Sequence, residues 1–343
     1  MTFDEQMMYR CLQLAALGRG NVAPNPMVGA VIVHEGKIIG EGYHQQFGGP
    51  HAEVNAVNAV QQVELLSEST IYVTLEPCSH FGKTPPCANL LVEKKFKRVV
   101  VGTLDVHAKV YKKGIKRLED HGIDVTVGIC EEECQELNRA FFTFHEKKRP
   151  FVLLKWAQTN NGLLDNSKGN PGEITWISAH ETQVKVHQWR NEFQSIMVGK
   201  NTVINDNPSL TIRAIEGRNP IRIVLDSRNE IPSTSSILSS AAETIVFNLE
   251  KNSSQDHLNF VKLPELSPKL ILESLFEQQI QSVLIEGGKK VLQSFIDAKL
   301  WDEARIITGK SSFESGTSAP EINGQKIKEE VFFGDHISYI RPL

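Results

Sequence analysis

Short apolar runs alternate with helix-forming stretches along the chain, and this alternation constrains the fold more than any other feature. Strands that alternate with helices are typical of α/β domains. In the first half, helices are expected near 52–62, 86–95 and 112–121. The apolar runs around them are VGAVIV (28–33), TIYVTL (70–75), RVVVGT (98–103) and DVTVGI (124–129). This half is therefore predicted to be an α/β domain.

The N-terminal residues predict one more helix. Thr2 and Glu5 have the spacing of a capping box, and an apolar stripe with helical period follows and ends at Gly18. A charged segment, CEEECQELNRAFFTF (130–144), closes the first half and is also expected to be helical.

A second alternation begins after HEKKRP (145–150), where a cluster of basic residues meets a proline. Its helices are expected near 179–193 and 289–299, and the tail EVFFGDHISYI is expected to form closing strands. The apolar runs are FVLLKWA (151–157), SIMVG (195–199), IRIVLD (221–226), TIVFN (244–248) and SVLIEGG (282–288). Because 343 residues exceed what one core usually supports, we predict two domains, residues 1–147 and 148–343.

Composition excludes several classes of function. The chain is 40% hydrophobic and 23% charged and has no apolar run near 18 residues, so we expect no membrane span. The polar start MTFDEQMMYR does not resemble a secretory signal, which predicts a cytoplasmic protein. A net charge of -4 with dispersed lysines indicates a small-molecule substrate and no nucleic acid. Five scattered cysteines favour metal binding over disulfides.

Two motifs carry the chemistry, HAEVNAV (51–57) and LEPCSHFGKTPPC (75–87). Both lie where a strand is expected to give way to a helix, and a helix N-terminus stabilises the thiolate that zinc requires. His51, Cys78 and Cys87 supply three ligands, which leaves the fourth tetrahedral position for water, as in catalytic zinc sites. Glu53 is placed to act as the general acid and base. This combination is the signature of zinc deaminases.

The spacing between the two cysteines is nine residues, longer than in the short P-C-x-x-C form. A buried histidine with two structural cysteines is the competing interpretation. His80 lies in the intervening loop and is expected to line the pocket or contact the substrate. Asn25, held between two prolines in PNPMVG, is a candidate for recognising the edge of a heterocycle, although the segment is also compatible with a plain turn.

PNPxVG, HAE and EPCSHxGxTPPC, together with the layout of the second half, resemble the bifunctional deaminase/reductase family of riboflavin biosynthesis over essentially the whole chain. The resemblance implies a cytidine-deaminase-like three-layer domain followed by a dihydrofolate-reductase-like α/β domain. It implies one zinc ion per chain, NADPH as cofactor, and a homo-oligomer, dimer or tetramer. The implied reactions are deamination of 2,5-diamino-6-(5-phosphoribosylamino)pyrimidin-4-one and NADPH-dependent reduction of the ribosyl group to ribityl.

In the second half, GKNTVINDNPSLTIR (199–213), PIRIVLD (220–226) and IEGG (285–288) match that family. Gly287 and Gly288 lie between a strand and a helix, where bare backbone can approach a cofactor phosphate, or where a tight turn would suffice. Asp206 and Arg213 are expected in a turn-rich loop that binds ribose hydroxyls and phosphate, although ordinary surface pairs would look similar. Further substrate contacts are assigned to Lys155, Leu210 and Glu286. Further cofactor contacts are assigned to Ala157, Trp176, Ser178, Gly199, Thr202, Asp206, Asp226 and Ser227.

Three departures from the family pattern touch both halves. The loop DVHAKVYKKG keeps Asp105, Val110 and Gly114 but loses the prolines of the family motif. Asn161 stands where the family usually has aspartate, and Gln183 stands where an arginine commonly lies near the substrate phosphate. A lost charge-assisted contact costs about 1.5 to 3 kcal/mol unless His180, Lys185 or His187 compensates.

Three interpretations remain open from the sequence. The leading one is the bifunctional enzyme. The second is a deaminase of another nucleoside or base, and the third is a deaminase whose second half is a degenerate, reductase-like binding domain.

Overall fold

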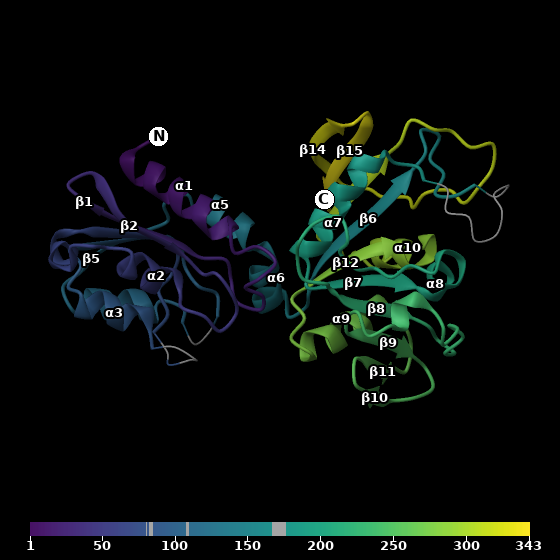
Figure 1. Ribbon diagram of the computed structural model, residues 1–343, viewed down its shortest axis with the longest axis horizontal. Coiled ribbons are helices and arrows are strands. Elements are labelled where there is room, and N and C mark those ends of the chain that lie inside the picture. Colours follow the sequence, from purple (N-terminus) through teal and green to yellow (C-terminus); the bar gives the residue numbers. More distant parts are fainter. Residues whose placement is uncertain (80, 82–84, 108–109, 167–175) are drawn as a thin grey trace. The chain divides into compact units, whose positions relative to one another are not determined.

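The computed structural model describes residues 1–79, 81, 85–107, 110–166 and 176–343 (Figure 1). The chain divides into two compact units, Met1–Lys147 (unit 1) and Lys148–Leu343 (unit 2). Within the described residues, no helix combines the length and apolarity needed to cross a membrane.

Unit 1 is built around a five-stranded sheet with the order β2-β1-β3-β4-β5. β1 pairs antiparallel with β2 and β3, and β3, β4 and β5 run parallel. Its elements are α1 (Phe3–Ala16), β1 (Gly29–His34), β2 (Lys37–Tyr43), α2 (Ala52–Asn58), η1 (Val63–Glu68), β3 (Thr70–Leu75), α3 (Cys87–Glu93), β4 (Arg98–Thr103), α4 (Lys113–Glu119), β5 (Asp124–Val127), α5 (Glu131–Leu137) and α6 (Arg139–Lys147).

Helices cover both faces of this sheet. Ala56 of α2, Leu91 of α3 and Leu118 of α4 pack in one core cluster, whereas Met8 of α1 and Cys134 of α5 pack in another. Figure 1 shows α1 and α5 on one side of the strands and α2 and α3 on the other. The predicted three-layer domain is confirmed.

The local predictions for unit 1 hold with two differences. The capping box of Thr2 and Glu5 is present at the start of α1. The charged segment after residue 130 forms two helices, because Asn138 leaves the helix and bonds both backbone polar groups of Met27. β2 was not predicted. Its glycines break the strand pattern, yet Gly40 and Gly42 are required because a Cβ would lie 2.5 Å and 2.3 Å from the backbone of Ala56.

Unit 2 contains a ten-stranded sheet with the order β10-β11-β9-β8-β7-β12-β6-β13-β15-β14. The seven strands from β11 to β13 are parallel, and β10, β15 and β14 are antiparallel to their neighbours. The elements are β6 (Phe151–Gln158), α7 (His180–Glu192), β7 (Ser195–Gly199), α8 (Lys200–Asp206), β8 (Ile221–Leu225), η2 (Ser236–Leu238), β9 (Thr244–Asn248), β10 (Ser253–Gln255), β11 (Leu258–Lys262), α9 (Pro268–Glu277), β12 (Ser282–Gly287), α10 (Lys289–Asp297), β13 (Glu303–Thr308), β14 (Gln325–Phe332) and β15 (Asp335–Arg341).

The strands predicted for unit 2 are present, and so are α7, α10 and the closing hairpin of β14 and β15. One prediction is wrong in its local structure. Asp206 was expected in a loop between strands, but it is the last residue of α8, which Asn207 ends in the left-handed conformation. Because turn-forming residues follow position 205, the hydrophobic pattern of the sequence does not indicate this short helix.

Candidate functional site

His51, Cys78 and Cys87 converge in unit 1. His51 is the N-cap residue of α2, Cys87 is the first residue of α3, and Cys78 follows β3. The Nδ1 atom of His51 lies 3.6 Å from the Sγ atom of Cys78 and 3.2 Å from that of Cys87. The three candidate ligand atoms all lie within 4.8 Å of one another.

These distances fit a zinc ion. With Zn–S near 2.3 Å and Zn–N near 2.05 Å, a tetrahedral site has S···N edges of about 3.6 Å. The backbone N–H of Cys87 donates to the Sγ atom of Cys78 at 3.3 Å. Contact with Cys87, together with His51, lowers the pKa of Cys78 to about 4. One sulfur is therefore stabilised as the thiolate that binds metal.

Glu53 lies in the first turn of α2, two positions after His51. Its side chain is only 3% exposed, and burial raises the pKa of its carboxyl group above the usual value. The carboxyl group contacts the thiol of Cys87. The carboxyl group of Glu53 lies next to the three candidate ligands, where it can exchange protons with a molecule bound at the site.

Asn25 is oriented by His44, a residue that the sequence analysis missed. The Nδ1 atom of His44 donates to the carbonyl of Pro50 at 2.9 Å, so Nε2 accepts a hydrogen bond from the amide of Asn25 at 3.0 Å. The ring of His44 also packs edge-on against His51, with 5.5 Å between centroids. Among the described residues, the side-chain oxygen of Asn25 accepts no hydrogen bond, so it is the atom that can accept one from a ligand. No motif spacing links positions 25 and 44.

The loop after β4 is fastened to the second motif through Glu76. The carboxylate of Glu76 accepts hydrogen bonds from the backbone N–H groups of Asp105, Lys112, Gly114 and Ile115 at 3.0 to 3.4 Å. A Cβ on Gly114 would lie 2.0 Å from the carbonyl oxygen of Pro77. The close approach to Pro77 explains why the divergent loop DVHAKVYKKG keeps Gly114, and Asp105 accepts a hydrogen bond of 2.7 Å from the backbone N–H of His107 within the same loop. His80, the predicted substrate contact, lies outside the described residues.

In unit 2, Lys155 and Glu286 come together with Arg190, which the sequence analysis missed. Arg190 on α7 donates two hydrogen bonds of 2.8 Å to the carboxylate of Glu286, and the ammonium of Lys155 lies 3.7 Å from it. Burial alone would raise the pKa of Glu286, but Arg190 and Lys155 lower it to about 2. Arg190 lies two helical turns after Gln183 on α7, where Val186 and Trp189 are buried. Residues separated by two turns lie on the same face of a helix, so the sequence could have indicated Arg190 as a neighbour of the expected site.

Of the three residues expected to compensate for Gln183, only His187 is shown near this cluster. Its Nδ1 atom accepts a hydrogen bond from the backbone N–H of Arg213 at 3.3 Å. Burial, with Arg190 and Arg213 nearby, lowers the pKa of His187 to about 4. The guanidinium of Arg213 donates to Ser209 Oγ at 2.7 Å.

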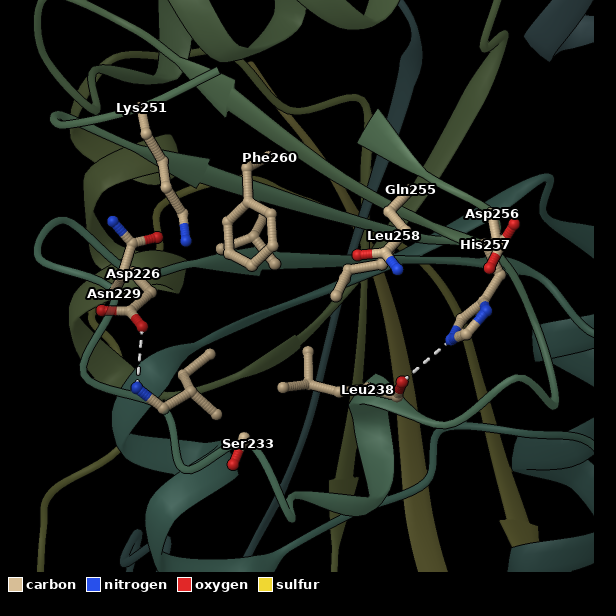
Figure 2. A pocket seen from close by; sticks show the side chains of 12 residues that line it. Asp226, Asn229, Ser233, Leu238, Lys251, Gln255, Asp256, His257, Leu258 and Phe260 are labelled. Atoms are coloured by element: carbon tan, nitrogen blue, oxygen red, sulfur yellow. Dashed lines mark hydrogen bonds between the residues drawn. The ribbon is translucent and has the colours of Figure 1, made fainter. Parts of the chain in front are cut away.

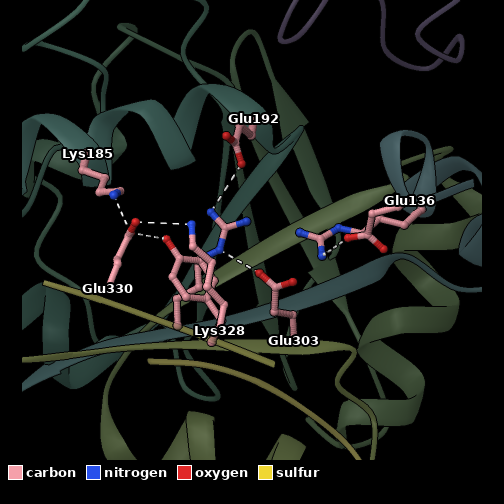
Figure 3. Close-up of polar contacts among 9 residues, drawn as sticks. Glu136, Lys185, Glu192, Glu303, Lys328 and Glu330 are labelled. Atoms are coloured by element: carbon pink, nitrogen blue, oxygen red, sulfur yellow. Dashed lines mark hydrogen bonds and ion pairs between the residues drawn. The ribbon is translucent and has the colours of Figure 1, made fainter. Parts of the chain in front are cut away.

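The helix that carries Arg190 and His187 is anchored on the strands of the C-terminal hairpin and β13 (Figure 3). Lys185 pairs with Glu330 of β14, which also accepts a hydrogen bond of 2.6 Å from Tyr339. Arg305 of β13 pairs with Glu192 at 3.3 Å and with Glu303 at 2.7 Å. Lys185 is thus engaged in holding α7.

Four of the predicted cofactor residues surround the start of α10. The backbone N–H of Gly288, the N-cap residue, donates to Thr202 Oγ1 at 3.1 Å. A Cβ on Gly287 would lie 3.4 Å from Thr202, and one on Gly199 would lie 3.0 Å from Val291. A helix N-terminus with little side-chain bulk in front of it suits a phosphate group.

The other predicted residues of unit 2 lie on elements around this region, and their roles stay predictions. Ala157 is on β6, Leu210 is buried after α8, and Ser178 precedes α7. Trp176 is 60% exposed. Ser227 and the buried Asp226 follow β8. Burial, and to a smaller extent Asp165, raises the pKa of Asp206.

Asn161 has a structural task that aspartate could not perform. Its amide donates to the carbonyl of Phe313 at 2.8 Å, and its oxygen accepts from Thr159 Oγ1 at 2.7 Å. A carboxylate has no donor for the first of these bonds. The departure from the family pattern is therefore accommodated by the loop that faces it.

Two protein families match the two units. The family described as "Cytidine and deoxycytidylate deaminase zinc-binding region" matches residues 1–103, and "RibD C-terminal domain" matches residues 150–309. The chain is 39% identical to the riboflavin biosynthesis protein RibD of Aquifex aeolicus, over 96% of this chain and 93% of that protein. It is 35% identical to RibD of Escherichia coli, over 88% and 86%.

Solved structures agree with these relatives. A diaminohydroxyphosphoribosylaminopyrimidine deaminase/5-amino-6-(5-phosphoribosylamino)uracil reductase from Thermotoga maritima superposes with a TM-score of 0.92, 37% identity and 99% coverage of both chains. RibD of Acinetobacter baumannii gives a TM-score of 0.90 and 31% identity, also with 99% coverage of both chains. A zinc-binding deaminase domain with a His-Cys-Cys cluster is thus joined to a reductase domain of the NADPH-using type. The chain belongs to the RibD family of riboflavin biosynthesis proteins.

Proposed function

We propose that this protein is a bifunctional enzyme of riboflavin biosynthesis that deaminates a phosphoribosylated diaminopyrimidine in unit 1 and then reduces its ribosyl chain in unit 2. The observation that carries the proposal is the convergence of His51, Cys78 and Cys87 beside the buried Glu53. The substrate we assign is 2,5-diamino-6-(5-phosphoribosylamino)pyrimidin-4-one, which is the substrate class named for the Thermotoga maritima relative.

In unit 1, His51, Cys78 and Cys87 would hold zinc, which lowers the pKa of a coordinated water towards ~7 and so supplies the nucleophile. Glu53 takes up a proton at its carboxylate and delivers it to the departing amino nitrogen. Asn25 orients the ring through its carbonyl oxygen, since His44 holds the amide of Asn25. The low exposure of Glu53 keeps bulk water from competing for that proton.

In unit 2, NADPH supplies a hydride when bound. We assign its phosphates to the start of α10, where Gly287 and Gly288 leave the backbone open. Lys155 and Glu286 are assigned to the sugar of the substrate, and Arg213 to its phosphate. Arg190 keeps Glu286 ionised and fixed, so that the carboxylate can accept hydrogen bonds from sugar hydroxyls.

The test is the mass of the product that purified, zinc-loaded protein forms from this substrate with and without NADPH. We expect the exchange of one amino group for oxygen without NADPH, and a gain of two further hydrogens only when NADPH is added. Deamination with no reduction at any NADPH concentration would contradict the role of unit 2. No change in mass under either condition would contradict the substrate.

We also propose that the enzyme is a homo-oligomer, a dimer or tetramer. β14 is an edge strand of the sheet in unit 2, and Val331 and the following Phe333 are 64% and 63% exposed. Apolar side chains on an unpaired edge favour association with a second copy. Light scattering of the purified protein tests this.

A cytoplasmic location is proposed because all five cysteines are free and two serve as reduced ligands.

A further inference from the structure

The loop at residues 207–213, which carries Arg213, has an irregular and strained backbone. It belongs to neither a helix nor a strand. Two of its residues have positive φ, Asn207 at 40° and the buried Leu210 at 50°. A leucine in the left-handed region is strained, so the loop keeps its shape only because its surroundings fix it. We call residues 207–213 the phosphate loop, because Arg213 is assigned to the phosphate of the substrate.

In the part of the chain that the structure describes, four side chains from outside the phosphate loop bind its backbone. They are those of His187, Arg190, Asn219 and Arg222. Asn219 makes the shortest of these contacts, since its Oδ1 atom accepts a hydrogen bond of 2.9 Å from the N–H of Ile212. Its Nδ2 atom donates to the carbonyl of Ala241 at 3.0 Å. Asn219 therefore links the phosphate loop to the turn around residue 241.

Arg222, on β8, binds the same turn from the interior. Its side chain is fully buried. One terminal nitrogen donates to the carbonyls of Ser239 and Ala242, the latter at 2.6 Å, and the other donates to Ser239 Oγ at 3.3 Å. Asn219 and Arg222 thus both tie the phosphate loop to residues 239–242, which we call the anchor turn.

The anchor turn is itself fixed on both sides. Just before it, the carbonyl of Leu238 accepts a hydrogen bond of 3.0 Å from the ring of His257, as Figure 2 shows. Just after it, the N–H of Thr244 donates to the backbone carbonyl of His257 at 2.7 Å. Thr244 also pairs with Arg222 in the sheet. A support that is held in this way can determine where the phosphate loop lies.

The position of the phosphate loop determines the direction of the Arg213 side chain. Its guanidinium donates to Ser209 Oγ at 2.7 Å, and that oxygen lies 3.2 Å from Thr211 Oγ1. Arg213 is exposed, so without these contacts its side chain would sample many conformations. An arginine that is oriented in advance binds a phosphate more tightly, because less conformational entropy is lost on binding.

We propose that Asn219 is a positioning residue of the reductase site: it holds the phosphate loop on the anchor turn and so orients Arg213 for the phosphate of the substrate. Arg222 supports the same arrangement from the interior. The proposal rests on the proposed function of unit 2 and adds the residues that determine its preference for a phosphorylated substrate. A compound without phosphate makes no such contact with Arg213, so Asn219 does not affect its affinity.

The experiment measures steady-state reduction by the full-length, zinc-loaded protein at saturating NADPH. Two compounds are compared, the deaminated substrate and the same compound without its phosphate. In Asn219→Ala, KM for the phosphorylated compound should rise about five- to tenfold, because two hydrogen bonds at the loop are lost. Its kcat, and kcat/KM for the compound without phosphate, should stay at the wild-type values. Arg222→Lys keeps the charge but has fewer donors, and should raise the same KM by a smaller factor.

Asn252→Ala is the matched control. It also loses a hydrogen bond between an asparagine side chain and a backbone N–H, that of Lys262 at 2.7 Å. Lys262 is the last residue of β11, whereas Asn219 precedes the first residue of β8, so the two asparagines serve opposite ends of parallel strands. KM for the phosphorylated compound should be unchanged in Asn252→Ala.

The thermal midpoint of each variant establishes that it is folded. Should Asn219→Ala not fold, Asn219→Ser takes its place, since its side chain is too short to reach both Ile212 and Ala241. An unchanged KM for the phosphorylated compound, or an equal loss of kcat/KM for both compounds, would overturn the proposal while the function of unit 2 stands. No reduction by the wild type would contradict that function and the proposal with it.

Discussion

In unit 1 three of the four reactive side chains, those of His51, Glu53 and Cys87, lie at the starts of two helices, whereas in unit 2 they come from strands and from a helix far apart in the sequence. His51 and Cys87 are 36 residues apart, and each is fixed by its own helix. Glu286 is 96 residues from Arg190 and is fixed by charge pairing. The comparison teaches that the first site depends on local backbone, and the second depends on strand order and buried ion pairs.

The largest expected effect is a loss of deaminase activity, which is confined to unit 1. Glu53→Gln keeps the size of the side chain but cannot accept a proton, so ammonia release should fall by about 10²- to 10⁴-fold. Zinc content, measured by mass spectrometry, should stay at one per chain, and reduction of the deaminated substrate should be unaffected. Ammonia release at the wild-type rate would contradict the proton-transfer role. In the companion variant Cys87→Ser zinc should be lost, and its retention would place the third ligand elsewhere.

The next largest effect is a loss of reductase activity, which is confined to unit 2. Arg190→Lys replaces the two parallel hydrogen bonds on Glu286 with a single contact, and kcat/KM of the reductase should fall about ten- to a hundredfold. Deamination by the same protein should not change. Lys185→Arg is the matched control on the same helix, since its partner is Glu330. Equal losses in both variants would mean that α7 is merely destabilised.

A pH series sharpens the comparison, because all four tryptophans lie in unit 2 and their fluorescence reports its unfolding alone. The folded pKa of His187 is about 4, below the value of 6.5 expected when unfolded. The unfolded chain therefore binds the proton first, and stability falls as pH drops from 6.5 towards 4. Between pH 7 and pH 5 we expect a loss of up to about 2 kcal/mol in the free energy of unfolding. In His187→Gln the free energy of unfolding should depend less on pH over this range. An unchanged pH dependence would show that His187 is not its cause.

The smallest effect concerns Asn161. Asn161→Asp removes the hydrogen bond to the carbonyl of Phe313, so the free energy of unfolding of unit 2 should fall by about 1 kcal/mol. Urea unfolding followed by tryptophan fluorescence measures it. A more stable variant would show that the amide has no such task.

Much of unit 1 could be predicted because its information is local. The cap at Thr2, the strands at 70–75 and 98–103, and the ligands at helix starts are all set by neighbouring residues. β2 escaped prediction because its glycines respond to α2, which packs on it. His44 escaped because its partners, Asn25 and Pro50, are assembled by the fold.

In unit 2 the strands could be predicted, but their order could not. Lys155 and Glu286 meet because β12 pairs with β6, a neighbour relation that no motif encodes. Arg190 completes the cluster from α7, and the family comparison of single positions pointed to Gln183 instead. Buried ion pairs of this kind become visible only once the topology is known.

The most direct test of the central claim, two independent sites in one chain, is a mixing experiment with Glu53→Gln and Glu286→Gln proteins. Each is incubated with the diaminopyrimidine ribosyl phosphate and NADPH, first separately and then together, and the product mass is measured. Glu53→Gln alone should leave the substrate unchanged, and Glu286→Gln alone should accumulate the deaminated, unreduced compound. The mixture should form the deaminated and reduced product. If the mixture stops at the deaminated compound, the two sites do not act independently and the account is contradicted.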